Sequence, residues 1–155
     1  WTDTLNGLLS GNFGRPKLEA HRCTPFGTWR IEAQNHTKKE NAKKGLTNKY
    51  SAFTIAGASI GVTAPTFKKW HQTFWENLDI SVQLHNIKKV IVINHRDCGG
   101  AVAAYGQEKF ANKEIETETH KSALIEFKKQ LKIKHPKLVT ELYLMDLDGS
   151  VISFD

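Results

Sequence analysis

Cysteine is scarce in this chain, with only Cys23 and Cys98 among 155 residues. Two thiols cannot build a disulfide scaffold, so each is a free core residue, half of a single bridge or a metal ligand, and a reducing compartment is favoured. Long apolar runs are also absent, because none approaches the roughly 20 residues that cross a bilayer. The sequence therefore predicts a soluble, cytoplasmic protein that has no membrane partner.

Acidic residues are outnumbered, with 16 against 22 lysines and arginines, which gives a net charge of +6. A basic balance raises the possibility of a nucleic-acid-binding domain. The lysines are nevertheless spread along the chain, several of them at helical spacing beside glutamates, and no nucleic-acid-binding motif accompanies them. We expect a solvated basic surface and no nucleic-acid partner. The length and the 39% hydrophobic content predict one domain over residues 1–155.

Hydrophobic periodicity predicts alternating helices and strands. In chain order, the expected elements are an irregular N-terminal arm (1–30), an exposed helix (31–44), a buried strand (50–59), a helix after Pro65, an apolar strand (88–95), helices over 101–105 and 116–135, and a closing hairpin around Asp148 and Gly149. Apolar stripes are expected on the two long helices, one of Phe67, Trp70, Phe74, Leu78, Val82 and Ile87, the other of Leu124, Phe127 and Leu131. The fold class is therefore α/β, a mainly parallel sheet flanked by helices with an N-terminal arm and a C-terminal hairpin, in which residues 50–95 form a βαβ unit.

The apolar strand over 88–95 runs directly into the polar segment HRDCGG, residues 95–100. In open α/β sheets, the crevice beyond the carboxyl ends of the strands is where ligands bind. A histidine and a cysteine three residues apart on a tight loop can both turn toward one tetrahedral zinc ion. Spacing alone leaves a second interpretation equally open, in which Cys98 is a buried thiol and His95 a hydrogen-bonded residue at a strand end.

The sequence resembles the β-class carbonic anhydrase superfamily, in particular a bacterial branch of it. The resemblance is carried by "AGAS", by "FKKWHQTFWENLDISVQLHNIKKVIVINHRDCGGAVAAYG" and by the closing "LYLMDLDGSVISF", and it covers about two thirds of the chain. It implies a β-carbonic-anhydrase-like fold with His95 and Cys98 as ligands of a catalytic zinc. The implied activity is reversible hydration of carbon dioxide to bicarbonate by a zinc-bound hydroxide. It also implies a homodimer or higher homo-oligomer, in which the N-terminal arm packs on the neighbouring subunit.

The family's other half-site, a C-x-D-x-R element, is altered here. The corresponding segment reads HRCTPFGTWRIE, residues 21–32, so Cys23 is followed by neither the aspartate nor the arginine at the family's spacing. One interpretation keeps Cys23 as the third zinc ligand, with Arg30 or Arg22 doing part of the arginine's work and His21 as a reserve ligand. The other is a degenerate, non-catalytic homologue that binds a small anion or a protein partner. A related hydrolase, acting for example on carbonyl sulfide, is a further alternative.

The loop between the two ligands contributes further candidates. Asp97 and Arg30 are the predicted catalytic residues, although Asp97 can equally be a carboxylate that caps the loop. Arg96 is predicted to be a salt-bridging residue at the surface or at an interface. Solvated imidazoles are expected at the remaining histidines, His36, His71, His85, His120 and His135.

Overall fold

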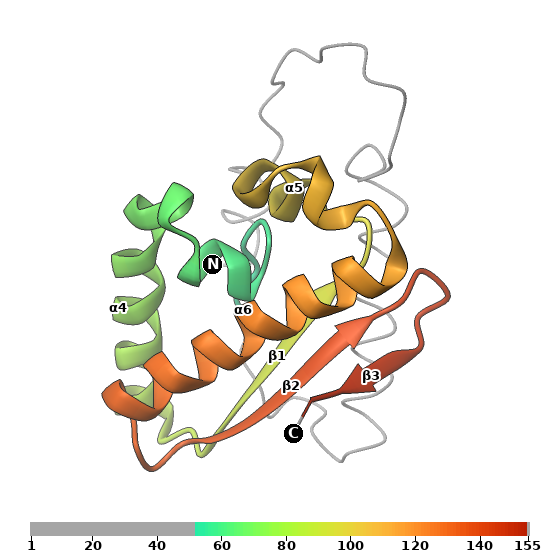
Figure 1. Ribbon diagram of the computed structural model, residues 1–155. Coiled ribbons are helices and arrows are strands. Elements are labelled where there is room, and N and C mark those ends of the chain that lie inside the picture. Colours follow the sequence, from blue (N-terminus) through green and yellow to red (C-terminus); the bar gives the residue numbers. More distant parts are fainter. Residues whose placement is uncertain (1–51, 155) are drawn as a thin grey trace.

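The computed structural model describes residues 52–154, in which helices cover a three-stranded sheet (Figure 1). Two short helical segments, α3 (Ser59–Thr63) and the 3-10 helix η1 (Pro65–Phe67), lead into the long helix α4 (Lys68–His85). Strand β1 (Lys89–His95) follows, then α5 (Gly99–Tyr105), the 3-10 helix η2 (Gln107–Phe110) and α6 (Lys113–Lys134). Strands β2 (Val139–Met145) and β3 (Val151–Ser153) end the described chain.

The sheet has the order β1-β2-β3 and contains one parallel and one antiparallel pair. Strands β1 and β2 run parallel, in a register that sets Lys89 opposite Val139 and His95 opposite Met145. The predicted hairpin is confirmed, because β2 and β3 pair antiparallel around a turn in which Gly149 takes a φ of 85°. Because the carboxyl ends of β1 and β2 coincide, the residues after His95 and after Met145 lie side by side.

Helix α6 crosses one face of the sheet in front of β1 and β2 (Figure 1). It begins at Lys113, three residues before the predicted start at 116. The reason is Asn112, whose side-chain oxygen accepts the backbone N–H of Ile115 at 2.9 Å and so caps the first turn. This earlier start places Glu116 within the first turn of the helix.

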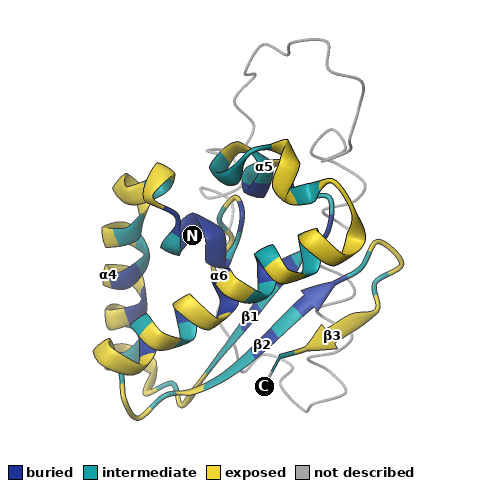
Figure 2. Ribbon diagram, in the orientation of Figure 1, coloured by how far each residue is buried: buried dark blue, intermediate teal, exposed yellow. Residues whose placement is uncertain are grey.

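The core lies between α6, α4 and the sheet. Its main cluster contains the predicted Leu124, Phe127 and Leu131 of α6, together with Trp75 and Leu78 of α4 and residues of both parallel strands. The stripe predicted for α4 is wrong at Trp70, which is 38% exposed and stacks on Phe67, while Trp75 takes the buried place against Phe127. Helix α3 is buried, whereas the outer sides of α4 and α6 are exposed (Figure 2).

The strand predicted over 50–59 is not present in its described part. Residues 52–55 have no regular secondary structure, residues 56–58 form a turn, and α3 begins at Ser59. Gly57 and Ala58 both have positive φ angles, of 78° and 47°, and the N–H of Ala58 donates to the carbonyl of Ile55 at 3.1 Å. These small residues therefore turn the chain where the β-branched pattern predicted extension. The βαβ unit of the described residues is instead β1, the helices α5 and α6, and β2.

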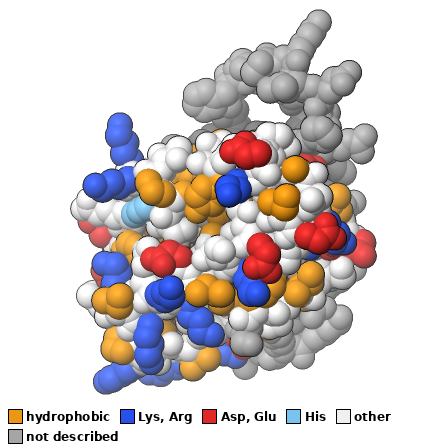
Figure 3. Space-filling model, in the orientation of Figure 1, with side chains coloured by type: hydrophobic (Ala, Val, Ile, Leu, Met, Phe, Trp, Pro, Cys, Tyr) orange, Lys and Arg blue, Asp and Glu red, His pale blue; other side chains and the backbone are white. Residues whose placement is uncertain are grey.

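The described residues thus have an α/β fold with a mixed sheet, in agreement with the predicted class at this level. The N-terminal arm (1–30) and the helix predicted over 31–44 lie outside the described residues. No helix within 52–154 is long and apolar enough to cross a membrane. On the face shown in Figure 3, basic side chains alternate with acidic ones over α6 and gather toward the lower left, where α4 and α6 end.

Candidate functional site

Strand β1 carries the predicted ligands to the carboxyl end of the sheet. His95 is its last residue, and Cys98 directly precedes α5. The N–H of Arg96 donates to the carbonyl of Met145 at 3.0 Å, which extends the contact with β2 one residue beyond the strand. The loop of residues 96–98 therefore occupies the position at which open α/β sheets bind ligands.

The glycines after Cys98 allow a close approach of two backbone segments. A Cβ atom at Gly100 would lie 2.7 Å from the backbone nitrogen of Gly57 and 3.1 Å from the carbonyl carbon of Ala56. Any larger residue would push these segments apart. The small residues of the AGAS segment therefore pack against the start of α5, in the neighbourhood of the candidate site.

His95 has a defined tautomer. Its Nδ1 atom lies 2.8 Å from the carbonyl oxygen of Arg96, and because a carbonyl can only accept, Nδ1 must carry the proton in this contact. The lone pair is then on Nε2. In a typical metal-binding histidine, one ring nitrogen donates a hydrogen bond that orients the ring, and the lone pair of the other nitrogen binds the metal.

Cys98 is buried, with 3% of its surface exposed. It belongs to a small cluster with Ile60, Ala64, Ala101 and Ala123. Within residues 52–154 there is no group of three or more histidine, cysteine or acidic side chains placed to hold a metal ion. The other predicted site residues, Cys23 and Arg30, together with the reserve candidates His21 and Arg22, lie outside the described residues.

Arg96 forms the predicted salt bridges, but the prediction of a surface position is wrong, because only 6% of its side chain is exposed. Its Nη1 donates to Glu116 Oε2 at 3.0 Å, and its Nε donates to Asp146 Oδ2 at 3.1 Å. Its Nη2 donates to the hydroxyl of Thr117 at 2.8 Å. The guanidinium therefore faces inward, between the start of α6 and the end of β2, because these two segments supply the acceptors that its fork geometry requires.

Glu116 also holds the next residue of the loop. Its Oε1 accepts the backbone N–H of Asp97 at 2.7 Å. Asp97 has a φ of 53°, the left-handed conformation that aspartate tolerates better than most residues. The predicted catalytic role of Asp97 stays a prediction, whereas its position within a fixed loop between the two ligand candidates is a property of the structure.

A buried polar pair lies beside the loop. The side-chain oxygen of Asn94 accepts the N–H of Ser59 at 3.1 Å, and its amide nitrogen lies 3.1 Å from His120 Nδ1. His120 was expected to be solvated and is instead 1% exposed, because α6 turns this face toward β1. Burial, assisted by the nearby charges of His95 and Arg96, lowers the pKa of His120 to about 4.

Of the remaining histidines, three lie in the described residues. His85 is exposed, as predicted. His71 and His135 are half-buried, with His71 Nε2 3.1 Å from the carbonyl of Ala64 and His135 Nε2 2.9 Å from Asp79. The expectation of solvated imidazoles is therefore wrong for these two. His36 lies outside the described residues.

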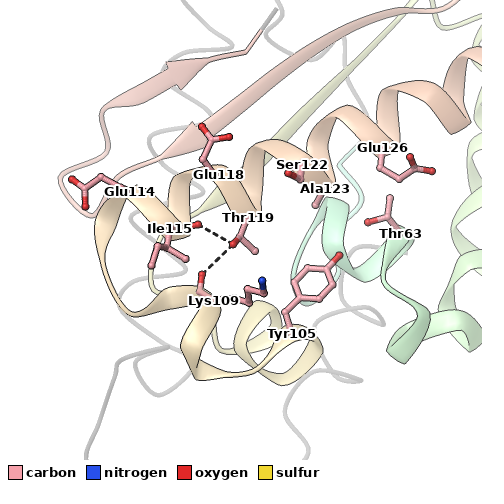
Figure 4. A pocket seen from close by; sticks show the side chains of 10 residues that line it. All are labelled: Thr63, Tyr105, Lys109, Glu114, Ile115, Glu118, Thr119, Ser122, Ala123 and Glu126. Atoms are coloured by element: carbon pink, nitrogen blue, oxygen red, sulfur yellow. Dashed lines mark hydrogen bonds between the residues drawn. The ribbon is translucent and has the colours of Figure 1, made fainter.

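A surface groove of about 690 Å³ lies between α6 and the segment from Tyr105 to Lys109 (Figure 4). Tyr105 and Lys109 border it on one side and the outer face of α6 on the other, with Glu114, Glu118 and Glu126 at its rim. None of residues 95–98 lines it. The loop therefore does not line the groove, although Ala123 both lines the groove and packs in the cluster that contains Cys98.

Three polar residues of the site, Asn94, Glu116 and Asp146, were not recognised from the sequence. Glu116 and His120 are four residues apart, so their helical spacing already placed them on one face, and this signal was available. Asp146 contacts an arginine 50 residues away, and no local pattern indicates such a pairing.

The site and the fold define an α/β protein with a buried, ion-paired loop at the end of two parallel strands. The chain belongs to the same family as a protein of Rickettsia bellii (strain RML369-C) named "Uncharacterized protein", to which it is 32% identical over 117 residues, 76% of this chain and 71% of the relative. A protein of Rickettsia conorii (strain ATCC VR-613 / Malish 7), also named as uncharacterized, shares 32% identity over 76% of this chain and 63% of the relative. No protein-family model and no solved structure matches the chain.

Proposed function

We propose that this protein is a zinc-dependent carbonic anhydrase of the β class, with His95, Cys98 and Cys23 as the metal ligands. The observation that carries the proposal is the loop at the end of β1, where the His95 ring is oriented with Nε2 as its ligating atom. Cys98 follows after Arg96, which ion pairs hold, and after Asp97, whose backbone N–H donates to Glu116. Imidazole nitrogen and thiolate sulfur are the donor atoms that zinc prefers. The resemblance in the sequence supplies the activity, since the names of the Rickettsia relatives carry none.

The chain's own residues prepare the site for this chemistry. When bound, zinc would lower the pKa of a water molecule toward about 7 and so make a nucleophile available at neutral pH. The Arg96 carbonyl orients the His95 ring through Nδ1. The apolar cluster around Cys98 shields the sulfur from bulk water. Asp97 and Arg30 are the residues we assign to orienting the substrate and the attacking water.

The proposal includes a β-carbonic-anhydrase-like architecture and a homodimer or higher homo-oligomer. In this architecture the sheet is mainly parallel, so further strands would run parallel to β1 and β2. Among the described residues, β1 pairs only with β2, so its other edge is where a further strand would be added. The substrates are carbon dioxide and bicarbonate, and neither nucleic acid nor membrane is a partner.

The test is to measure zinc per chain on the 155-residue protein purified under reducing conditions and to follow carbon dioxide hydration by stopped flow on the same sample. We expect about one zinc per chain with turnover, and loss of both in His95→Gln and Cys98→Ser, because two of three ligands cannot retain the ion. His85→Gln, which removes an exposed imidazole at the end of α4, is the matched control and should keep both. Full zinc content in Cys98→Ser contradicts the site, and full content in Cys23→Ser removes Cys23 from it.

A non-catalytic homologue is the second candidate, and a specific observation favours it. The C-x-D-x-R element is altered, and Arg96 cannot replace the missing arginine because its guanidinium is buried and bonded to Glu116, Asp146 and Thr117. This candidate predicts zinc without turnover, or no zinc at all. Measuring metal content and hydration on the same sample separates the two candidates.

A further inference from the structure

Glu116 holds both residues that separate the two candidate ligands. Between His95 and Cys98 the chain has only Arg96 and Asp97. One oxygen of Glu116 accepts from the Arg96 guanidinium at 3.0 Å, and the other accepts the backbone N–H of Asp97 at 2.7 Å. A single carboxylate therefore fixes one of these residues by its side chain and the other by its backbone.

The carboxylate stands on a rigid support. Glu116 is in the first turn of α6, and its own N–H donates to the carbonyl of Asn112, the residue that caps the helix. Four residues later, His120 is buried against Asn94 of β1 and against the ring of Phe110. The helix is thus anchored on the strand that carries His95, so Glu116 cannot move independently of the sheet.

Arg96 also connects the loop to the end of β2. Besides Glu116 it bonds Asp146, the residue directly after β2, while its backbone N–H donates to the carbonyl of Met145. Lys113 also reaches Asp146, at 2.8 Å, and this contact, with Arg96 contributing, lowers the pKa of that carboxyl. The loop is consequently tied to the start of α6 and to the end of β2 at once.

We propose that Glu116 is a positioning residue that sets the relative placement of His95 and Cys98, and that metal affinity at this pair depends on it. The inference rests on the proposed zinc site. Asp97 is held in a left-handed conformation, and without the carboxylate it loses the acceptor of its N–H and one ion-pair partner of its neighbour. The two ligands then sample wider relative positions, and a site that must converge on one ion binds it more weakly.

The test compares Glu116→Gln with Glu114→Gln in the full chain, using cobalt(II) as a spectroscopic substitute for zinc. Glu114 lies in the same turn of α6 and is exposed, so its loss changes the charge at the helix start equally without touching the loop. We expect cobalt affinity to fall about 10- to 100-fold in Glu116→Gln, the usual effect of removing a group that orients a ligand, and to stay unchanged in Glu114→Gln. Equal cobalt affinity in the two variants overturns the proposal.

A second readout separates this inference from the proposed function. Amide hydrogen exchange at Asp97, measured on the metal-free full chain, should accelerate in Glu116→Gln and not in Glu114→Gln, because the single amide oxygen of glutamine cannot accept from the Arg96 guanidinium and the Asp97 N–H at once. If the unmodified protein binds no cobalt, the proposed zinc site is wrong. If exchange at Asp97 is unchanged in Glu116→Gln, the positioning role of Glu116 is wrong, whether or not the protein binds metal. Should Glu116→Gln fail to fold by circular dichroism, Glu116→Asp, which keeps the charge and shortens its reach, is measured against the same two expectations.

Discussion

Arg96 shares its guanidinium among segments that are far apart in the sequence. Its partners Glu116 and Asp146 are 20 and 50 residues away, and both are less exposed than ordinary surface carboxylates. Removing one member of a buried ion pair leaves the other charges desolvated and unpaired, which costs far more than the pair itself contributes. Arg96 therefore contributes more to the stability of the contacts between the loop, α6 and β2 than an exposed lysine would.

The comparison of Arg96→Met with Lys113→Met tests this difference, because both side chains bond the same oxygen of Asp146. We expect Arg96→Met to lower the free energy of unfolding by about 3 kcal/mol. Lys113 is 64% exposed, so Lys113→Met should cost about 0 to 1 kcal/mol. Urea unfolding of the two variants measures both values, and similar losses would show that the arginine acts as a surface residue.

His120 makes stability depend on pH. Its pKa is lowered from 6.5 to about 4 by burial and by the charges of His95 and Arg96, with Glu116 3.9 Å away as the facing carboxylate. Since the unfolded chain binds the proton more readily, this group costs no stability above pH 6.5 and costs progressively more as pH falls toward 4. Between about pH 7.5 and about pH 5 the loss is about 2 kcal/mol.

The measurement is the free energy of unfolding of the metal-free protein at the two pH values, in the unmodified chain and in His120→Gln. The variant should lose this part of the pH dependence, although its overall stability can be lower. His85→Gln is the control, because it removes an exposed histidine and should follow the unmodified protein. An identical pH dependence in His120→Gln and the unmodified chain would exclude His120 as the source.

At the scale of elements, α6 joins the core to the candidate site. Its middle and end supply Leu124, Phe127 and Leu131 to the main cluster, and its first turn supplies Glu116 to the loop. The groove of Figure 4 lies along the face of α6 that carries Thr119, Ser122 and Ala123. One amphipathic helix thus contacts the polar loop with its first turn, the apolar core with its buried side and the surface groove with another face.

Leu131→Ala and Ile133→Ala form a matched pair on this helix. Leu131 is fully buried, so truncation leaves a cavity in the main cluster and should cost about 2 to 5 kcal/mol. Ile133 is 82% exposed, and its truncation should change the free energy of unfolding by less than about 0.5 kcal/mol. Thermal or urea unfolding checks both values, and equal losses would contradict the placement of α6 on the sheet.

The elements with strong periodicity were predictable from the sequence. The apolar strand, the helix after Pro65, the stripe of α6 and the hairpin at Gly149 all follow from local patterns, and the structure confirms them. The strand prediction over 50–59 was wrong in its described part. The chain turns at Gly57 and Ala58, whose positive φ angles the hydrophobic pattern does not reveal. The location of the loop was predictable because it directly follows the apolar strand. The ion pairs of Arg96 with Glu116 and Asp146 were not predictable, because they depend on tertiary contacts.

At the scale of the whole molecule, the candidate site belongs to the sheet as much as to the loop. Arg96 directly after β1, Glu116 at the start of α6, and Met145 and Asp146 at the end of β2 meet within one network. The pairing of β1 with β2 in a single register brings Arg96 and Asp146 together. Any change that shifts this register moves the acceptors of Arg96 away from it.

The register also sets an order of events during synthesis. Because Asp146 follows β2, a ribosome must release the chain as far as residue 146 before Arg96 can find its final partners. We therefore expect the loop to acquire its fixed form last, after α6 has docked on β1, and a nascent chain to be unable to retain an ion at His95 and Cys98 until then. In pulsed hydrogen exchange during refolding, protection of the Asp97 amide should appear after that of the β1 amides; simultaneous protection would contradict this order.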